Sequence, residues 1–586
     1  MGVAGRARRR LERGRQRPVV SGAPDGPAVA LTRARRAVVL ADRVRGPELA
    51  MWLDRVADAD VIVLAAHERP DWDLGRRGAR YQKASRPDRI HEVLSVLGPV
   101  DAVVNLRREG GQTHRRLFEA AFFHLRHGGL YVVPRAAIDD RVDSGGQAGG
   151  FLKRVAHLSR RVGLDFSELS DLPREERELS LAVKATTIST DEVTIQKNGN
   201  HLLKVRHANA TAVLRRRSES LGVDELAVLD GGAVRTGTRV VTHGPPETQG
   251  RFSVPLTYPT LHLRRYDGAI GLAPEGLVVS GDSVLPDSFR WHLSPQANNA
   301  GLYFASEHFA RLRSEAAPVR HLDGAFYHLD YANPGHFGHL TTEALAKLWG
   351  WEQAKDRIPD LKLIHSRGEH HHRVPSLEQR FLDAFGVDEA DVVVFDEPVT
   401  VDTLVCATPM WHNADPFYAH PGILDTWERI AAGLPASSVE AGPRIFVSRP
   451  PAAKNRACRD TQAVEDYFRD AGFSIVRPER HPLAEQASIF AGARVVAGFG
   501  GSAMFNLMYA RNLERVVVLS SASYDSQNEY FYAAVRGADI HYFYGDTDVA
   551  QPDDGWSYAA YQSSWSFDLD RFRDDLDRTV AVGVSS

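Results

Sequence analysis

The sequence predicts an α/β protein, because short apolar strands alternate with helical stretches in three separate parts of the chain. The clearest part is residues 483–520, where the periodicity predicts a helix, a buried strand, a glycine turn, a second helix and another buried strand. Residues 37–140 and 321–435 show the same alternation. With 586 residues, the chain is long enough to bury several hydrophobic cores.

The alternation of these patterns divides the chain into seven predicted segments. They are a basic arm (1–36), a Rossmann-like domain (37–140), a linker and helix (141–180), a β-rich segment (181–320), two further Rossmann-like domains (321–435 and 436–550) and a C-terminal tail (551–586). The β-rich segment has the rhythm of hairpins, with Gly, Asn and Pro between short strands. The tail shows little regularity.

Composition and charge exclude several classes of protein. A hydrophobic content of 43% is ordinary for a globular protein, and a net charge of −3 argues against a general nucleic-acid binder. No run approaches the ~18 apolar residues of a membrane span, and the N-terminus lacks the apolar stretch of a signal peptide. Cys406 and Cys458 are the only cysteines and cannot form a disulfide framework, so we expect a cytoplasmic protein.

The glycine turn within residues 483–520 is a candidate anion site. Gly498, Gly500 and Gly501 follow a predicted strand, and Ser502 stands where the N-cap of the next helix would lie. Such a turn leaves unpaired N–H groups facing one point, with the positive end of the helix dipole behind them, which suits a phosphate or diphosphate. The alternative is a tight strand-to-helix connection with no ligand.

Two arginines are expected at the same edge of the sheet as this turn. Arg449 ends a predicted strand at residues 444–449, and Arg456 follows a Pro-rich turn. Because the strand ends of a parallel sheet gather at one edge, both guanidinium groups could meet a diphosphate with fork geometry. The alternative is a pair of surface salt bridges with Glu465 or Glu479, which would contribute only ~0–1 kcal/mol each.

Residues 444–519 resemble the C-terminal half of family 61 glycosyltransferases (the DUF563 group). The matching positions are Ser448, Arg449, Arg456, Glu465, Gly472, Phe473, Glu485, Gln486, Gly501, Ser502 and Asn506. A second patch, residues 335–339 followed by Glu343, resembles the family's segment that opens a helix. Many members carry His where this chain has Gly500, so no role of that His is carried over.

The resemblance implies an inverting glycosyltransferase of GT-B architecture, with two Rossmann-like domains facing each other across a cleft. The C-terminal domain would bind a nucleotide-diphosphate sugar, and the preceding domain would present a hydroxyl of a glycan or lipid-linked glycan for hexosyl or pentosyl transfer. The expected donor-binding residues are Arg449, Arg456, Glu485, Gln486, Gly500, Gly501, Ser502 and Asn506.

His339 and Glu343 are the expected catalytic residues. They are four positions apart at the start of a predicted helix, so they share one face. An inverting transfer needs a base that removes the proton of the acceptor hydroxyl, and His is the commonest choice because its pKa lies near neutrality. The alternative is a helix end whose polar residues are satisfied locally.

We expect no cofactor and no metal. His365 and the three histidines at 370–372 cannot all point at one ion from a regular helix, which favours an exposed loop. The acidic triplets at 71–73 and 546–548 resemble the Asp-x-Asp motif of GT-A enzymes, but such triplets are frequent by chance. The expected enzyme is therefore metal-independent and fully active in excess EDTA.

Two other regions bear on partners. Residues 122–133 resemble class I methyltransferases, but residues 41–47 lack the glycine-rich loop that S-adenosylmethionine needs, so we expect a methyltransferase-like domain without cofactor. A working methyltransferase in glycan biosynthesis and a non-catalytic scaffold remain the alternative functions. The basic arm (1–36) is either a solvated tail or a peripheral contact to the inner membrane face, at about 1 kcal/mol per basic residue.

Overall fold

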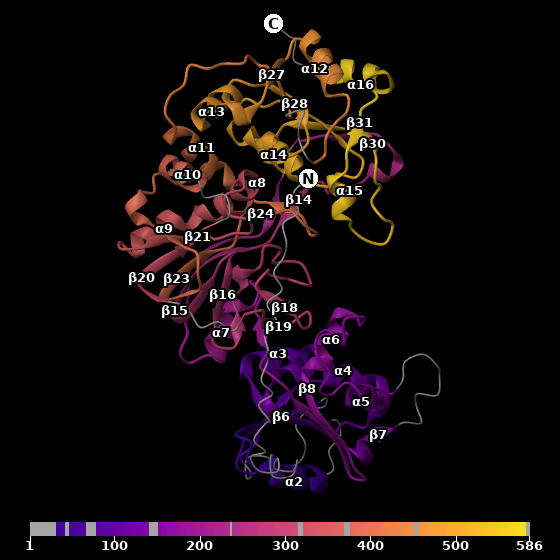
Figure 1. Cartoon of the computed structure of the whole chain (residues 1–586). Helices are drawn as coiled ribbons and strands as arrows, with labels where there is room; N and C mark the ends of the chain where they lie inside the picture. Colours follow the sequence, from indigo (N-terminus) through magenta and orange to yellow (C-terminus); the bar gives the residue numbers. More distant parts are fainter. Residues whose placement is uncertain are drawn as a thin grey trace, which may run out of the picture. The chain divides into compact units, whose positions relative to one another are not determined.

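The computed structural model describes residues 31–41, 46–65, 78–139, 150–234, 237–314, 320–367, 376–449 and 455–581. The predicted α/β class is confirmed, because parallel and mixed sheets alternate with helices through these ranges (Figure 1). The chain divides into two compact units. The first comprises Met1–Leu94, Pro99–Leu169 and Ser180–Gly199, and the second comprises Ser95–Gly98, Ser170–Leu179 and Asn200–Ser586.

The first unit is built on a seven-stranded sheet of order β3-β2-β1-β4-β6-β9-β8. Its strands are β1 (Arg36–Ala41), β2 (Asp60–Ala65), β3 (Arg80–Lys83), β4 (Val100–Asn105), β6 (Leu125–Pro134), β8 (Val183–Ile188) and β9 (Glu192–Lys197). The main helices are α2 (Gly46–Arg55), α3 (Pro87–Leu97), α4 (Gly111–Ala121) and α5 (Phe151–Ser159). The five strands from β3 to β6 in this order are parallel, which confirms a Rossmann-like fold.

The sheet does not stop at the predicted boundary near residue 140. The sequence places β8 and β9 in the β-rich segment, but both strands extend the sheet of the first unit. Val132 of β6 pairs with Thr194 of β9, and the neighbouring Val193 and Ile195 are fully buried there. The apolar alternation marks a hairpin correctly, but it does not say which sheet the hairpin joins.

The second unit contains two large sheets. The first is a mixed sheet of eleven strands. Ten of them follow the order β18-β19-β10-β17-β16-β15-β23-β20-β21-β22, and β11 pairs with β15. Its strands are β10 (Leu202–Lys204), β11 (Gly222–Leu229), β15 (Leu261–Ala273), β16 (Leu277–Ser280), β17 (Ser283–Val284), β18 (Leu302–Phe304), β19 (Phe309–Leu312), β20 (Arg320–His328), β21 (Lys362–Ser366), β22 (Val392–Phe395) and β23 (Val399–Ala407). The strands β22, β21, β20 and β23 are parallel, while β15 is antiparallel to β23. The predicted segments 181–320 and 321–435 therefore share one sheet, because β15 hydrogen-bonds along its length to β23.

The helices around the parallel part of this sheet begin and end at local signals. They are α9 (Trp351–Arg357), α10 (Leu377–Phe385) and α11 (Ile423–Gly433). These signals are clear at both ends of α10. Ser376 caps its first turn by accepting from the Gln379 amide, and Gly386 ends it with a φ of 95° that favours glycine.

The second sheet of this unit has the order β13-β30-β29-β28-β26-β27, with β31 on β30. Its strands are β13 (Val240–His243), β26 (Arg444–Val447), β27 (Ser474–Val476), β28 (Val495–Phe499), β29 (Arg515–Ser521), β30 (Asp539–Thr547) and β31 (Trp565–Ser566). The connecting helices are α12 (Thr461–Asp470), α13 (Leu483–Ala491), a 3-10 helix (Ser502–Tyr509) and α14 (Asn528–Arg536). All strands but β31 are parallel, as predicted for residues 436–550.

The C-terminal tail is part of this domain, and the prediction of low regularity is wrong. The segment forms α15 (Tyr558–Gln562), β31 and α16 (Leu569–Ala581), which lie beside β30 in Figure 1. Trp565, Phe572 and Leu576 are buried in one cluster with Phe446 and Phe543 of the sheet. The sequence of α16 is amphipathic, with apolar residues three or four positions apart, so this helix could be predicted from the sequence.

A single hydrophobic cluster runs through both sheets of the second unit. It includes Leu263 and Tyr327 of the mixed sheet, Val447 and Val496 of the parallel sheet, and Trp411 between them. The two sheets are thus joined by a common core. Among the described residues, no helix is long and apolar enough to cross a membrane.

Candidate active site

The parallel sheet has a topological switch point between β26 and β28. The strand β27 follows β26 in the chain and lies on one side of it, whereas β28, β29 and β30 follow in order on the other side. In open parallel sheets, ligands bind outside the carboxyl ends of the strands at such a point. Arg449 lies just after β26, and Gly500 and Gly501 lie just after β28.

Both predicted arginines face the glycine turn. A Cβ atom built on Gly501 would lie 3.5 Å from Nη2 of Arg456 and 3.9 Å from Nη1 of Arg449. Gly501 also has a φ of 139°, a conformation that favours glycine. A cavity of about 440 Å³ opens in front of the turn and is lined by Arg449, Gly501 and Ser502, among others.

The amide groups of the turn differ from the prediction. The sequence predicts free N–H groups, but the Gly500 amide donates to the Leu519 carbonyl (2.9 Å) and the Gly501 amide to Oε1 of Glu529 (2.7 Å). Ser502 is the first residue of the 3-10 helix rather than its cap, because Gly501 occupies the cap position. In the described part of the chain, only the amides of Ser502 and Ala503 at this turn have no acceptor.

The two arginines are held by neutral groups. Nη2 of Arg449 donates to Asn455 (3.4 Å), and Nη1 of Arg456 donates to the Tyr561 hydroxyl (3.1 Å). The Arg456 guanidinium also lies 5.1 Å and 5.0 Å from the ring centroids of Tyr524 and Tyr561. Burial, together with the nearby Arg456, lowers the pKa of Arg449 to about 10, so the group stays cationic at neutral pH.

The salt-bridge alternative for these arginines does not hold. Glu465 is buried and bonds to Arg477 and to the Ser448 hydroxyl instead. Neither Arg449 nor Arg456 forms an ion pair with any residue that the structure describes. Arg449 therefore lines the cavity and Arg456 lies beside it at Gly501, and neither has an ion-pair partner among the described residues.

Three residues that support this corner were not predicted. Glu529 is fully buried and accepts from the Gly501 amide and from the Tyr524 hydroxyl (2.9 Å). Burial raises the pKa of Glu529, while these two donors and Arg456 oppose that shift. Glu529 and Tyr524 lie far along the chain from the turn, and Tyr561 lies in the tail, so no local pattern could identify them.

The remaining predicted donor-binding residues lie around the same cavity, with one exception. Gln486 and Asn506 line it, and the buried Asn506 leaves its Oδ1 atom without a partner while Nδ2 donates to the Ala503 carbonyl (3.1 Å). Glu485 does not line the cavity. Its Oε2 atom lies 2.9 Å from Nδ1 of the lining residue His481.

His339 and Glu343 form a hydrogen-bonded pair. Nδ1 of His339 lies 2.7 Å from Oε1 of Glu343, and Nε2 lies 3.3 Å from the side-chain amide nitrogen of Asn333. With that amide donating to Nε2, the imidazole proton lies on Nδ1 and is donated to Glu343. Nε2 is therefore the basic nitrogen of the ring.

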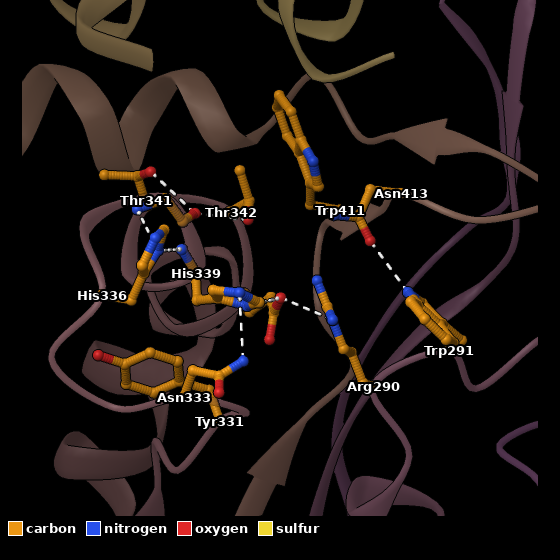
Figure 2. Close-up of polar contacts among 12 residues, drawn as sticks. Arg290, Trp291, Tyr331, Asn333, His336, His339, Thr341, Thr342, Trp411 and Asn413 are labelled. Carbon is orange, nitrogen blue, oxygen red and sulfur yellow. Dashed lines mark hydrogen bonds and ion pairs between the residues drawn. The ribbon is translucent and has the colours of Figure 1, made fainter. Parts of the chain in front are cut away.

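A third group, Arg290, completes this arrangement and was missed by the sequence. Its Nε atom lies 2.8 Å from Oε1 of Glu343, and Figure 2 shows Arg290 and His339 approaching from opposite sides. Burial alone would raise the pKa of Glu343, but Arg290 and His339 lower it overall. Glu343 is thus held as a carboxylate that fixes the imidazole.

The helical segment that carries this pair is irregular. The Nδ1 atom of His336 accepts from the amides of Gly338 (3.2 Å) and His339 (3.4 Å) and so caps the first turn. The chain then forms a π-helical turn (Leu340–Ala344) followed by a 3-10 segment (Leu345–Gly350). The predicted local capping therefore exists, but it uses His336 and leaves His339 to Glu343. Irregular turns of this type are frequent at functional sites.

The His339 segment contacts the glycine turn. A Cβ atom on Gly338 would lie 3.1 Å from Cβ of Ser502 and 3.2 Å from Cε2 of Phe505. The sequence predicts both motifs but not this contact. It brings the candidate base of one sheet and the arginine corner of the other into one region of the second unit.

The metal candidates lie elsewhere or are engaged. Asp546 and Asp548 pair with Arg571 and Arg459, and His365 is buried on β21. The triplet at 71–73 and the histidines at 370–372 lie outside the described residues. Among the described residues, one exposed group, His321 with Asp323 and Asp402, has metal-ligand spacing, at the amino end of β20.

The fold and these contacts define an α/β protein with a cationic ligand site at a sheet edge. Residues 337–517 match the family model described as Glycosyltransferase 61, which confirms the resemblance for this part of the chain and supports a glycosyltransferase activity. The match includes the His339 pair, the arginines and the glycine turn. No curated protein matches the chain.

The solved structures to which the chain is similar include methyltransferases. One is the MycE methyltransferase from the mycinamycin biosynthetic pathway with Mg, SAH and mycinamycin VI, with 18% identity over 28% of this chain and 45% of that chain and a TM-score of 0.24. Another is the antibiotic-resistance methyltransferase Kmr, with 13% identity over 29% of this chain and 90% of that chain and a TM-score of 0.19. A fibrillarin/Nop5p complex is also similar, with 12% identity over 29% of this chain and 79% of that chain and a TM-score of 0.19. The chain thus spans less than half of the MycE structure. At these TM-scores the similarity carries no argument about the fold or the activity of this chain.

Proposed function

We propose that the chain transfers a hexosyl or pentosyl group from a nucleotide-diphosphate sugar to a hydroxyl of a glycan or lipid-linked glycan. The reaction is inverting and metal-independent, on a GT-B-like pair of domains. The observation that carries this proposal is the pair of guanidinium groups at Gly501, which form no ion pair with a described residue and lie at a cavity that Arg449 and Gly501 line. The family match of residues 337–517 supports it.

The arginine corner provides the electrostatic part of the reaction. As the bond between the anomeric carbon and the diphosphate oxygen breaks, negative charge grows on the leaving nucleotide. Arg449 and Arg456 offset that charge, and the free amides of Ser502 and Ala503 add hydrogen bonds at the helix start. Gln486 and the unpaired Oδ1 of Asn506 bind hydroxyl or amide groups of the donor.

The His339 pair provides the proton transfer. Nε2 of His339 takes the proton of the acceptor hydroxyl while that oxygen bonds to the anomeric carbon from the face opposite the leaving diphosphate. Glu343 accepts from Nδ1–H and stabilises the imidazolium that forms. Asn333, which bonds to Nε2 in the free protein, is exposed and would give way to the acceptor.

The first unit serves assembly or acceptor docking in this proposal. Residues 42–45, which follow its first strand, lie outside the described residues, so the absence of an S-adenosylmethionine loop stays a prediction. The proposed location is the cytoplasm, with the basic arm at the inner membrane face; its residues 1–30 also lie outside the described residues. No nucleic-acid partner is proposed, given the net charge of −3.

Hydrolysis of nucleotide sugars without acceptor, screened over a donor panel with and without EDTA, tests the proposal. We expect slow release of nucleotide from one donor, unchanged by EDTA, and its loss in Arg449→Ala. Methyl transfer from S-adenosylmethionine without any donor hydrolysis would instead identify a methyltransferase. Inactivity in both assays, with no donor binding, would identify a scaffold.

A further inference from the structure

A second cavity lies at the switch point of the mixed sheet, which is between β20 and β23. It has a volume of about 210 Å³ and is lined by residues that follow these two strands, such as Tyr331 and Trp411, and by Glu343. Glu343 is the partner of His339, so the cavity adjoins the candidate base. This volume suits one sugar ring rather than an oligosaccharide or a nucleotide.

Two tryptophans line the cavity, and hydrogen bonds fix both. The Nε1 atom of Trp291 donates to Oδ1 of Asn413 (3.1 Å), and that of Trp411 donates to Oδ1 of Asn528 (2.9 Å). Trp411 is buried, whereas Trp291 is 43% exposed, an unusual loss of burial for so large an apolar side chain. Fixed indole rings at a cavity offer apolar faces to a ligand that also needs polar contacts.

Arg290 lies beside Trp291 and has unused hydrogen-bonding capacity. Its guanidinium carbon is 4.9 Å from the Trp291 ring centroid, and its Nε pairs with Glu343 (Figure 2). In the described part of the chain, the two terminal nitrogens of Arg290 have no acceptor. They are planar donors at the rim of the cavity, and they suit vicinal oxygen atoms.

The charges of the cavity favour a neutral ligand. Its lining includes the bases Arg290 and Lys347 and the acids Glu275, Asp287, Asp330 and Glu343. Burial lowers the pKa of Lys347 and raises the pKa of Asp287, so both groups are drawn toward their neutral forms. A phosphate would meet more acids than bases here, in contrast to the arginine corner.

The second cavity is also electrostatically close to the donor side. Burial raises the pKa of Tyr561, and both Arg456 and Arg290 act against that shift. The charge of Arg290 is therefore near enough to affect the pKa of the Tyr561 hydroxyl, which holds Arg456. A sugar in the second cavity would lie beside Glu343, the partner of the candidate base.

We propose that this cavity is the acceptor subsite, and that it binds the accepting sugar as a single neutral pyranose or furanose ring between Trp291 and Trp411, with Arg290 bonded to its hydroxyls. The inference rests on the proposed function and deepens it. It identifies the substrate class as a glycan whose accepting unit is uncharged. Trp291, Trp411 and Arg290 then determine acceptor specificity, while the donor is bound elsewhere.

Two measurements on the full-length protein test the inference. The first is saturation-transfer NMR with a panel of neutral methyl glycosides, methyl uronosides and sugar phosphates, on the wild type, Trp291→Ala and the control Phe166→Ala, which has the same 43% exposure in the first unit. We expect signals from at least one neutral glycoside, lost in Trp291→Ala and kept in the control. The second is kinetics with the neutral glycoside that gives a signal, for which Trp291→Ala raises the acceptor KM at least tenfold and the control Phe166→Ala leaves it unchanged.

The outcomes separate this inference from the proposed function. Binding of charged sugars only, equal signals in wild type and Trp291→Ala, or an unchanged acceptor KM would overturn the subsite while donor hydrolysis still supports the transferase. Absence of donor hydrolysis in the wild type would overturn the transferase, and the NMR panel would still decide whether the cavity binds a neutral sugar. No signal from any sugar would overturn the subsite.

Discussion

The two sheets of the second unit each have a switch point in their parallel part, and the two switch points differ in how their charges are arranged. At β26 and β28, Arg449 lines a cavity and Arg456 lies beside it at Gly501, and both are held by neutral partners. At β20 and β23, the carboxylate of Glu343 is paired with Arg290 and hydrogen-bonded to His339. Unpaired positive charge suits a departing anion, whereas a paired carboxylate and imidazole suit the transfer of a proton.

This difference also explains why the two points need different supports. The cationic corner requires Tyr524, Tyr561 and Glu529 to hold it, because the two guanidinium groups repel each other in a buried place. The paired point is stabilised by its own internal attraction. Both points therefore depend on distant parts of the chain, but the cationic corner needs three supporting residues, whereas Arg290 alone joins the helical turn of His339 and Glu343.

The largest effect is expected at the proton-transfer point. Replacing His339 with Ala removes the base, and turnover with acceptor should fall by about 10²–10⁴-fold. Acceptor-independent donor hydrolysis should change far less, since it does not need this base. The two rates measured side by side check this prediction. His321→Ala, an exposed histidine at the amino end of β20, is the matched control; equal losses in both variants would contradict the role of His339.

The next effect concerns the cationic corner. Arg449→Ala removes one of the two charges that face the leaving group, so kcat should fall by about 10²–10³-fold. The melting temperature should barely change, because the side-chain hydrogen bond of Arg449 to a described residue is a long contact to Asn455. Arg459→Ala, an exposed arginine paired with Asp548, is the control for an arginine in the same segment. A parallel loss of fold and activity in Arg449→Ala would show that the charge is structural.

The sequence predicts much of this corner because its signals are local. Arg449 follows the strand β26, and the glycine turn follows its strand β28, as expected. Apolar runs, a serine cap and glycine each act within a few residues, and these effects are readable in one dimension.

The rest of the site depends on contacts between distant residues. The strand β13 lies in the predicted β-rich segment but pairs with β30, about 300 residues later. Arg290 comes from a loop with no motif, and Tyr561 from the short helix α15 in the tail. Nothing near these residues in the sequence says which sheet edge they will reach. The occupied amides have the same cause, since Gly500 donates to Leu519 of β29 and Gly501 donates to Glu529 of α14.

The contributions of the two regions to folding stability should change with pH in opposite directions. Burial, with neighbouring cations, lowers the pKa of His207, His292 and His328 in the mixed-sheet region well below 6.5. A lowered folded pKa contributes stability that is present above the unfolded value and lost as pH falls below it. Burial raises the pKa of Glu529 in the corner, so its contribution is lost as pH rises through the folded value.

Thermal unfolding between pH 8 and pH 5 measures the larger of these effects. Below about pH 6.5, the slope of the free energy of unfolding against pH should approach 1.4 kcal/mol per pH unit for each histidine that stays neutral in the folded state. His292→Gln should flatten that slope, while the exposed His321→Gln should not. A slope that is the same in all three proteins would mean that carboxylates alone set the acid stability.

The smallest effect is expected at Asn506, which lies in the donor cavity close to the arginines but carries no charge. Its buried Oδ1 atom has no partner in the free protein, so a ligand N–H or O–H that reaches it gains a hydrogen bond worth about 0.5–1.5 kcal/mol. Asn506→Ala should therefore raise the donor KM roughly two- to tenfold and leave kcat nearly unchanged. Stability should change little, because the variant loses the bond from Nδ2 to Ala503 but also removes an unsatisfied buried oxygen. Donor titration by calorimetry, with Gln486→Ala as a second lining variant, distinguishes this from a purely structural asparagine, which would lower the melting temperature and leave the donor KM as it is.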